Sequence, residues 1–445
     1  MRYDKRVIVA IAVLMVVAGI GWNWYDVKIF LNWVLAAKQL SIVRIYEAYE
    51  LYGPQYRAVY PPLPILIFVA TDSVASEFLH SAYSALIYVS SRAVGALLAF
   101  TERFLLKLPI VIPVIVLSLI LARTYGRREI AYWLMLGIPT LVTIGTYQFD
   151  SLVALFLALS ILCLTKWRRP RLSALFLALA TLTKPLAAVF YLPIALYLSS
   201  WRKALQYLAL VAVTVIACIA PFLIIEPKAF IANVIGFHMG RPPQYLSLWN
   251  VPVLLTFRSP SVETFVDRAW IAGYVLGVAL VLAFLRPKPG NEPSLLASVV
   301  ALGIVTTFLN KVVNPNYLMW VYPEALILSF ACSCRQLGKL YNVYAGVGTL
   351  WPALYVTIPA LAGVPMYVEE ARSYVSARHL LLESLSPPLN KTFEKVFRLL
   401  DASKLHTYTL ALYHNLYVVG SIMICAYAAL GMYIILSLVR RFGRA

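Results

Sequence analysis

The sequence predicts an all-α polytopic integral membrane protein, and three observations support this fold class. Hydrophobic residues make up 62% of the 445 residues and charged residues only 13%, whereas soluble globular domains carry about 45–50% apolar and about 25% charged residues. Apolar runs of about twenty residues recur, each long enough to cross roughly 30 Å of hydrocarbon as a helix. These runs do not alternate between apolar and polar residues, as the strands of a membrane barrel would.

The apolar runs predict about fourteen spans within one membrane domain over residues 1–445, with twelve or thirteen as the alternative count because several runs are short. The first span is predicted at 6–24 and is retained, since no small-residue cleavage site precedes Trp22. The second begins near "YPPLPILIF" at Tyr60. The others are predicted near 83–100, 105–122, 131–147, 151–166, 172–183, 186–200, 204–224, 266–285, 294–309, 317–332, 342–361 and 416–438.

The loop charges predict the orientation in the cell membrane. Seven basic clusters fall in short loops or at the ends, and with their flanking residues they hold 19 Lys or Arg against 3 acids. They are "RYDKR", "RTYGRRE", "KWRRP", "SWRK", "RPKPG", "CRQLGK" and "RRFGR". By the positive-inside rule these clusters, and both termini with them, are cytoplasmic. The net charge of +19 therefore reflects topology, and no nucleic-acid partner is expected.

Three segments on the opposite side are too long for simple turns: 25–59, 226–265 and 362–415. The first opens with "DVKIFLNWVLAAKQL", whose apolar residues recur at helical spacing while Lys28, Asn32 and Gln39 fall on the other side, a pattern typical of a helix in the membrane interface. The third predicts two amphipathic helices broken at Pro387–Pro388. The functional site is therefore expected on the extracytoplasmic face.

Asp26 follows the aromatic belt of Trp22, Trp24 and Tyr25. A carboxylate at the outer membrane surface is partly dehydrated, which raises its pKa and makes it a better base. The alternative is an ordinary N-cap of the interfacial helix. Glu47 and Glu50 are second candidates for the base, or else members of a solvated loop.

Four cationic or titratable residues are predicted on the same outer face: Lys311, Arg241, His238 and Lys184. Cations at headgroup level suit a phosphate whose lipid tail lies in the bilayer. The alternative for each is a side chain that reaches out to the headgroups. Asp150, in "GTYQFDS", could pair with one of them. No P-loop, dinucleotide glycine motif, serine elbow or HExxH occurs, so hydrolysis of nucleoside triphosphates is not expected.

These residues resemble the GT-C superfamily of membrane glycosyltransferases, through the acid after the first span, the long first outer loop and "YPPL" at the second span. Three further stretches are similar to the catalytic subunits of GPI mannosyltransferase I: "FLNKVVNPNYLMWVYP", "ALATLTKPLAAVFYLPIAL" and "FHMGRPPQYLSLWN". The likeness covers most of residues 20–330 in order, and no motif follows residue 340. It implies a GT-C-like bundle of about 12–14 spans with long structured extracytoplasmic loops.

The resemblance implies an inverting transferase that moves a sugar, mannose in that family, from a polyprenyl monophosphate to a lipid-linked or surface glycan acceptor. Asp26 would remove the acceptor proton, while Lys311, Arg241 and Lys184 hold the leaving phosphate. Asn310, Asn314, Asn316 and Tyr317 would shape the donor pocket. The remaining candidates for substrate binding are His238, Glu47, Asp150 and Tyr60.

One departure from the family concerns metal. The family often shows Asp-x-Asp in the first loop, but here Lys28 occupies the second position, so no metal ligand is assigned and metal dependence stays open. No other cofactor is expected. The partners implied are the donor, the acceptor, membrane lipids and, as in related enzymes, a small membrane subunit. The main alternative is a transporter or flippase of lipid-linked sugars, which the lack of inverted repeats and the one-sided long loops disfavour; a structural membrane subunit is a third.

Overall fold

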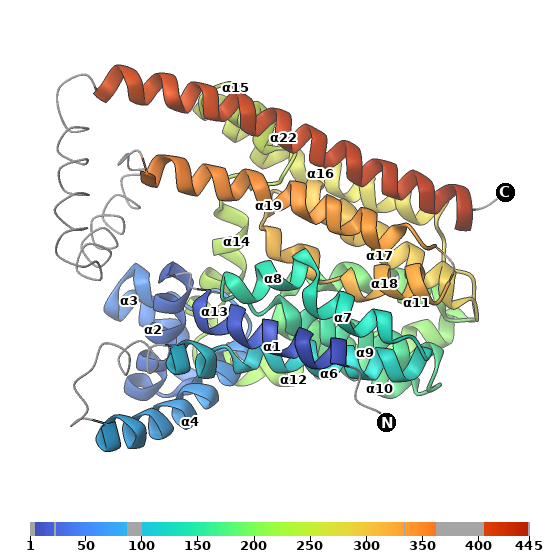
Figure 1. Ribbon diagram of the computed structural model, residues 1–445, viewed down its shortest axis with the longest axis horizontal. Helices are drawn as coiled ribbons and strands as arrows, with labels where there is room; N and C mark the ends of the chain where they lie inside the picture. The colour runs from blue at the N-terminus through green and yellow to red at the C-terminus, as the bar shows by residue number, and fades with distance from the viewer. Residues whose placement is uncertain (1–4, 22–23, 87–99, 333, 362–404, 444–445) are drawn as a thin grey trace.

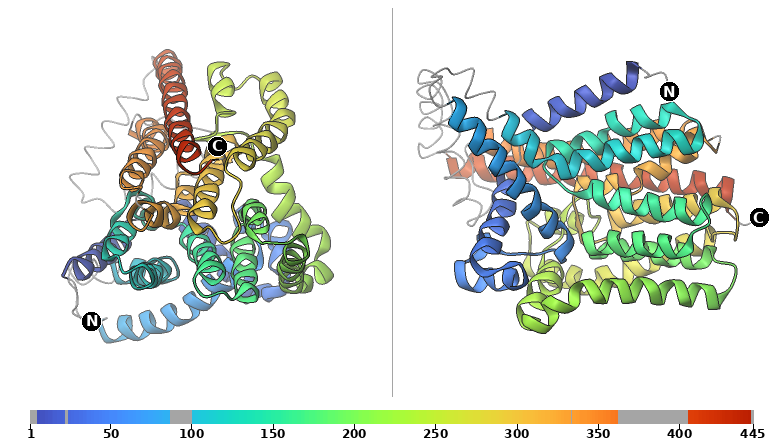
Figure 2. Two further views of the ribbon diagram at one scale, coloured as in Figure 1. Left: turned by 90° about the vertical axis from the view of Figure 1, so that its right-hand side faces the viewer. Right: turned by 90° about the horizontal axis from the view of Figure 1, so that it is seen from below.

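The computed structural model describes residues 5–21, 24–86, 100–332, 334–361 and 405–443. Almost all of these residues are helical, and the described strands are two-residue segments. The long helices lie side by side in one bundle, seen from the end and from below in Figure 2. The predicted all-α membrane fold is therefore confirmed.

The N-terminal half begins with the first predicted span and the first outer segment. Its elements are α1 (Lys5–Ile20), α2 (Trp24–Leu40), η1 (Ile42–Glu47), α3 (Ala48–Tyr52), η2 (Pro54–Tyr56), α4 (Pro62–Leu86), α6 (Leu108–Tyr125), α7 (Arg128–Leu136), α8 (Ile138–Gly145), α9 (Asp150–Thr165), α10 (Pro170–Thr183), η3 (Pro185–Phe190), α11 (Tyr191–Tyr197) and α12 (Trp201–Ile225).

The C-terminal half holds the second outer segment and the central helices. Its elements are α13 (Pro227–Ile231), η4 (Ala232–Gly236), α14 (Phe237–Gly240), β1 (Gln244–Tyr245), α15 (Asn250–Leu255), α16 (Pro260–Phe284), α17 (Glu292–Leu309), β2 (Val312–Val313), η5 (Pro315–Met319), α18 (Tyr322–Phe330), α19 (Leu337–Leu361) and α22 (Leu405–Phe442).

Five described helices are long and apolar enough to cross a membrane: α6, α12, α16, α17 and α22. In α17, 83% of the residues of its apolar stretch are buried, against 11% in α12. Helix α17 is therefore central in the bundle, whereas most side chains of α12 face outward. Small residues allow the close packing of α17, because a Cβ at Gly303 would lie 2.5 Å from the side chain of Val321. Of the other predicted spans, the second and the one at 342–361 lie in the long helices α4 and α19, and several more appear as shorter or broken helices. The count of fourteen stays a prediction.

Breaks in three of these apolar segments put polar residues inside the bundle. The segment 131–147 breaks at Gly137 between α7 and α8, and α10 ends at Lys184, before the proline that opens η3. The segment after α17 runs through β2 and η5 before α18. A proline cannot donate the next helical hydrogen bond, so Pro139, Pro185 and Pro315 stand at helix starts, beside side chains that face inward.

The two ends of the bundle differ. Both termini lie at one end, whereas α2 and α3 of the first outer segment lie at the other (Figure 1). The second outer segment is tied to the segment after α17 by the parallel pairing of β1 with β2, in which Gln244 lies opposite Val312. The end that carries α2 and α3 therefore gathers segments that are far apart in the sequence.

The structure tests the first outer helix directly. Residues 25–40 form a helix as predicted, with Trp33 and Ala36 fully buried. The placement of Asn32 on the solvated side was wrong, because Asn32 is 8% exposed and its Nδ2 donates to the carbonyl of Gln55 at 2.9 Å. The amide closes the loop that follows α2. Residues 362–404 of the third outer segment and most of the predicted span 83–100 lie outside the described residues.

Candidate active site

Asp26 lies in the first turn of α2, within the helix rather than in the position before it. Its Oδ2 accepts a hydrogen bond of 2.5 Å from Gln148 Nε2. Burial raises the pKa of Asp26 to about 7, and the hydrogen bond from Gln148 and the charges of Lys184 and Arg241 oppose that rise. A carboxyl group with a pKa near 7 can both accept and release a proton at neutral pH.

The turn between α8 and α9 presents Gln148 and Asp150. Tyr147, directly before them, has a φ of 60°, a left-handed backbone that is uncommon for a bulky residue. Its ring is buried and its hydroxyl donates to the carbonyl of Leu106 at 3.1 Å, which holds the turn in this conformation. Strained backbone of this kind often occurs at functional sites.

Asp150 and Lys184 form a fully buried ion pair, the kind of pairing considered for Asp150 in the sequence. Lys184 Nζ lies 2.9 Å from both carboxylate oxygens, with side chains 3% and 0% exposed. The Asn316 amide also donates to Asp150 Oδ2, and Trp320 Nε1 donates to Oδ1 at 2.5 Å. These donors fix the buried carboxyl group of Asp150, which in turn holds Lys184 in place.

Aromatic rings surround the Lys184 ammonium. Its Nζ lies 4.7 Å from the ring centroid of Tyr317, 5.0 Å from that of Phe149 and 5.5 Å from that of Tyr60. These distances allow cation–π attraction. Tyr317 and Tyr60, both predicted as substrate-binding, are therefore brought together around Lys184.

His238 and Arg241 lie on the second outer segment, against Tyr60. His238 Nε2 lies 2.9 Å from the carbonyl of Val59, which can only accept, so Nε2 carries the proton. Burial and the neighbouring Arg241 lower the pKa of His238 to about 4, so the ring is neutral at pH 7. Arg241 donates to Gln244 Oε1, and its guanidinium lies 5.4 Å from the ring centroid of Phe237.

Arg57 joins this group although it was not predicted. Its guanidinium lies 4.9 Å from the ring centroid of Phe237 and 4.5 Å from that of Tyr49, and its Nε donates to Asn233 Oδ1 at 2.8 Å. Arg57 also contributes to the lowered pKa of His238. Its place in the first outer segment, three residues before Tyr60, is the sequence signal that could have found it.

Lys311 has a different environment from the one expected. Its Nζ donates to Asp267 Oδ1 at 2.9 Å and to the carbonyl of Met239 at 2.7 Å, and its side chain is 2% exposed. It therefore lies beside the His238–Arg241 segment, with a carboxylate already bound. Asp267 was not predicted, although an acid at the start of an apolar span was a visible signal.

The remaining predicted residues have varied positions. Asn310 Nδ2 donates to the carbonyl of Val312 at 2.7 Å, which stabilises the local turn. The Oδ1 atom of Asn314 is buried and has no hydrogen-bond partner in the described part of the chain. Glu47 pairs with Arg44 at 2.5 Å, in contact with solvent, rather than with Asp26.

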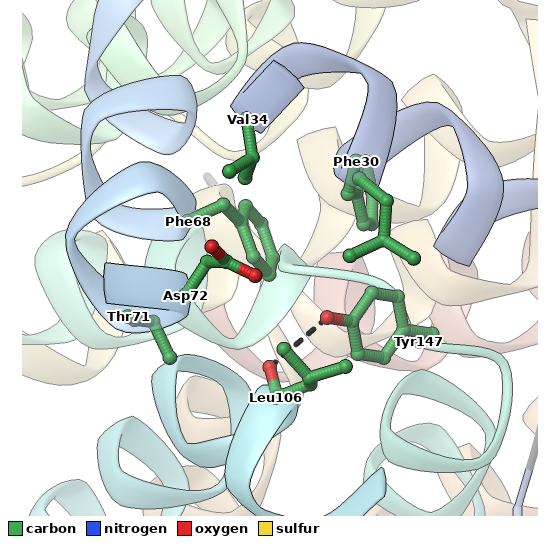
Figure 3. A pocket seen from close by; sticks show the side chains of 8 residues that line it. Phe30, Val34, Phe68, Thr71, Asp72, Leu106 and Tyr147 are labelled. Carbon is green, nitrogen blue, oxygen red and sulfur yellow. Dashed lines mark hydrogen bonds between the residues drawn. The ribbon is translucent and has the colours of Figure 1, made fainter. Parts of the chain in front are cut away.

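A small pocket lies between α2, α4 and the turn that carries Tyr147. Phe30, one helical turn after Asp26, lines it together with Phe68 and with Tyr147, the neighbour of Gln148 (Figure 3). Asp72 lies at its edge and pairs with Lys38 at 3.0 Å. The lining is otherwise mostly apolar, so lipid-like groups could contact this side of the site.

The described residues contain no group of three or more His, Cys, Asp or Glu side chains placed to hold a metal ion. Gln148, which contacts Asp26, and Trp320, which contacts Asp150, were not predicted. Gln148 stands in "GTYQFDS" and Trp320 in "PNYLMW", so both occur in stretches that already carried candidates. Their roles depend on contacts between segments more than 100 residues apart, which no local pattern contains.

The site thus gathers the partly buried carboxyl group of Asp26, the Asp150–Lys184 pair and further cations within one helical membrane bundle. Comparison with protein families matches residues 51–310, more than half of the chain, to glycosyltransferase family 87, and the chain belongs to this family. It is therefore a GT-C-like membrane glycosyltransferase. A search of curated proteins finds no match. The matched range includes Tyr60, Asp150, Lys184, His238 and Arg241; Asp26 and Lys311 lie outside it.

Proposed function

We propose that the protein transfers mannose from a polyprenyl-phosphate donor to a lipid-linked or surface glycan acceptor on the extracytoplasmic face, with inversion at the anomeric carbon. The observation that carries the proposal is Asp26, a partly buried carboxyl group that accepts from Gln148, has a pKa near 7 and lies within reach of the charges of Lys184 and Arg241. A base and cations in one site match the two needs of this reaction: removal of the acceptor proton and stabilisation of the leaving phosphate.

The proposed step is a single displacement. The acceptor hydroxyl oxygen forms a bond to the anomeric carbon, while the bond from that carbon to the phosphate oxygen breaks and its electron pair leaves with the polyprenyl phosphate. The acceptor proton moves to Asp26. Attack opposite to the leaving group inverts the anomeric configuration, and no covalent enzyme intermediate forms.

The contacts of the cations favour different roles for them. Lys184 is neutralised by Asp150 and Lys311 by Asp267, whereas Arg57 and Arg241 have amide partners and stack on Phe237. Guanidinium groups that are not already bound to a carboxylate suit a phosphate better. We therefore assign the first phosphate contact to Arg241, with Lys184 fixed nearby and Lys311 supporting the segment that carries Arg241.

The donor type follows from the surroundings of the site. The pocket against α2, the helix that carries Asp26, is lined mostly by apolar side chains, and the bundle end at α2 and α3 is the predicted outer face. A sugar linked to a polyprenyl phosphate dissolves in the membrane and presents its phosphate at headgroup level. Mannose rests on the resemblance of "FLNKVVNPNYLMWVYP" to mannosyltransferases.

The test uses purified protein in nanodiscs with radiolabelled polyprenyl-phosphate-mannose and, as a probe acceptor, an alkyl mannoside. We expect release of polyprenyl phosphate together with a labelled disaccharide of inverted configuration. Polyprenyl-phosphate-glucose tests the sugar. Movement of intact donor between leaflets without release of polyprenyl phosphate would contradict the proposal and favour the flippase.

A further inference from the structure

Gln148 uses both ends of its amide. It is 8% exposed; Nε2 donates to Asp26 Oδ2 at 2.5 Å, and Oε1 accepts from Asn316 Nδ2 at 3.3 Å. An amide nitrogen can only donate here and an amide oxygen can only accept. Since a carboxylate oxygen needs a donor and the Asn316 nitrogen needs an acceptor, the reversed amide would lose both contacts.

Asn316 is itself fixed by the buried ion pair. The nitrogen that donates to Gln148 also donates to Asp150 Oδ2, and Asp150 accepts from Lys184 with both oxygens. Asp150 is fully buried and Lys184 is 2% exposed. The hydrogen bonds therefore form a chain with one donor direction. Lys184 and Asn316 donate to Asp150, Asn316 also donates to Gln148, and Gln148 donates to Asp26.

We propose that Gln148 is a positioning residue that orients the Asp26 carboxylate and keeps it a usable base, with the Asp150–Lys184 pair as its anchor through Asn316. The inference rests on the proposed role of Asp26 in glycosyl transfer. It assigns a function to the amide before "FDS" and to the buried ion pair, neither of which needs to touch the substrate.

Several groups face Asp26 besides Gln148. Lys184 and Arg241 favour the ionised carboxylate, Asp150 opposes it, and the Tyr60 hydroxyl lies close enough to be affected by Asp26. Among the interactions that favour the ionised carboxylate, the hydrogen bond from Gln148 has the largest effect on the pKa of Asp26. Its removal destabilises the ionised form more than the neutral form, so the pKa of Asp26 must rise.

The experiment measures kcat against pH for Gln148→Leu with saturating polyprenyl-phosphate-mannose and the alkyl mannoside. Asp26 acts when ionised, so the rate rises with pH through its pKa. We expect the rising limb of the pH profile of Gln148→Leu to move to higher pH by about one unit, so that kcat at a given pH on that limb is about tenfold lower than in wild type. At high pH, kcat should return to the wild-type value. KM should change less than kcat. Gln206→Leu, an exposed glutamine on α12, is the matched control.

Gln148→Glu is the second variant, in case Gln148→Leu does not fold. It keeps the shape of the glutamine side chain but places a carboxyl group against Asp26, so the two groups share a proton. The rising limb of the pH profile should therefore move to still higher pH. Asn316→Leu should give a smaller upward shift, because it removes only the anchor.

Two results would overturn the inference. The first is a rate lowered equally at every pH, which indicates a merely structural role. The second is an unchanged profile in both Gln148 variants. Failure of the proposed function looks different: wild-type protein would then release no polyprenyl phosphate at any pH, or Asp26→Asn would keep the wild-type rate.

Discussion

At the scale of single residues, the pKa of Asp26, the proposed base, depends on burial and hydrogen bonding, which act on it in opposite directions. Burial disfavours the charged carboxylate, and Gln148, Lys184 and Arg241 favour it. The balance leaves the pKa of Asp26 near neutral pH, where proton transfer by such a group is most effective. Because its pKa is raised in the folded protein, ionisation of Asp26 lowers the stability of the fold.

This cost predicts a pH-dependent effect on stability. In the folded protein the pKa of Asp26 is raised from 3.8 to about 7, so its contribution is lost as pH rises between these values. The amide of Asp26→Asn does not ionise, so the variant does not lose stability in this way. Relative to wild type, the free energy of unfolding of the variant should therefore be about 3 kcal/mol larger, and the variant more stable, at pH 8 than at pH 5. Thermal unfolding in nanodiscs at both pH values measures this difference in stability between variant and wild type. A difference that does not grow with pH would contradict the raised pKa.

At the scale of elements, the site is assembled by helix ends rather than by helix faces. α10 ends at Lys184, α9 begins at Asp150 and η5 contains Asn316. Each comes from an apolar segment interrupted by a turn or a proline. The buried Asp150–Lys184 pair thus joins three elements, and both partners must be present for the charges to be tolerated.

Breaking that pair should destabilise the protein. Lys184→Met leaves a buried carboxylate without its cation and should cost about 3–5 kcal/mol. The double variant Asp150→Leu with Lys184→Met removes both charges and should recover most of that stability while activity stays low, because Asn316 and Gln148 lose their anchor. Denaturant titration of both variants is the measurement. Equal stability of the two would show that the charges are not coupled.

Lys311 supports the segment that carries Arg241, through its bonds to Met239 and Asp267. Lys311→Ala should weaken donor binding by about 10- to 150-fold, the equivalent of one charge-assisted contact of about 1.5–3 kcal/mol. Lys311→Arg should lie between wild type and Ala. Titration with polyprenyl-phosphate-mannose measures this effect. If Lys311→Ala bound the donor as tightly as wild type, both a phosphate contact and a supporting role would be excluded.

At the scale of the whole molecule, the bundle has two unlike ends. The termini with their basic clusters lie at one end and α2 and α3 at the other (Figure 1). We predict that the first end is cytoplasmic. Glu370, in the third outer segment, lies outside the described residues, so Glu50→Cys on α3 is the better outer probe. Arg127→Cys, between α6 and α7 in the basic cluster "RTYGRRE", is its cytoplasmic counterpart.

In a cysteine-free background, an impermeant thiol reagent should label Glu50→Cys in intact cells and Arg127→Cys only after lysis. Both positions are exposed, so access to solvent does not limit the reaction. The opposite pattern would place the site on the cytoplasmic side and rule out the proposed acceptor on the outer face.

The sequence predicted the parts that depend on composition and local period. The length of apolar runs predicted the membrane bundle, and the spacing of Trp33 and Ala36 predicted α2. Asp26, Asp150 and Lys184 were candidates because ionisable groups are rare in such a chain. The contact of Asp26 with Gln148, and of Lys311 with Asp267, could not be predicted, because each joins segments brought together only by packing.

The most direct test of the account is single-turnover transfer by Asp26→Asn. The amide keeps the shape of the carboxylate but cannot take the acceptor proton, so the loss should fall on the chemical step and not on donor binding. We predict that Asp26→Asn binds polyprenyl-phosphate-mannose with wild-type affinity and releases polyprenyl phosphate at least about 100-fold more slowly, while Glu77→Gln, an exposed acid on α4, behaves as wild type. A near-normal rate of release in Asp26→Asn would contradict the account and place the base elsewhere.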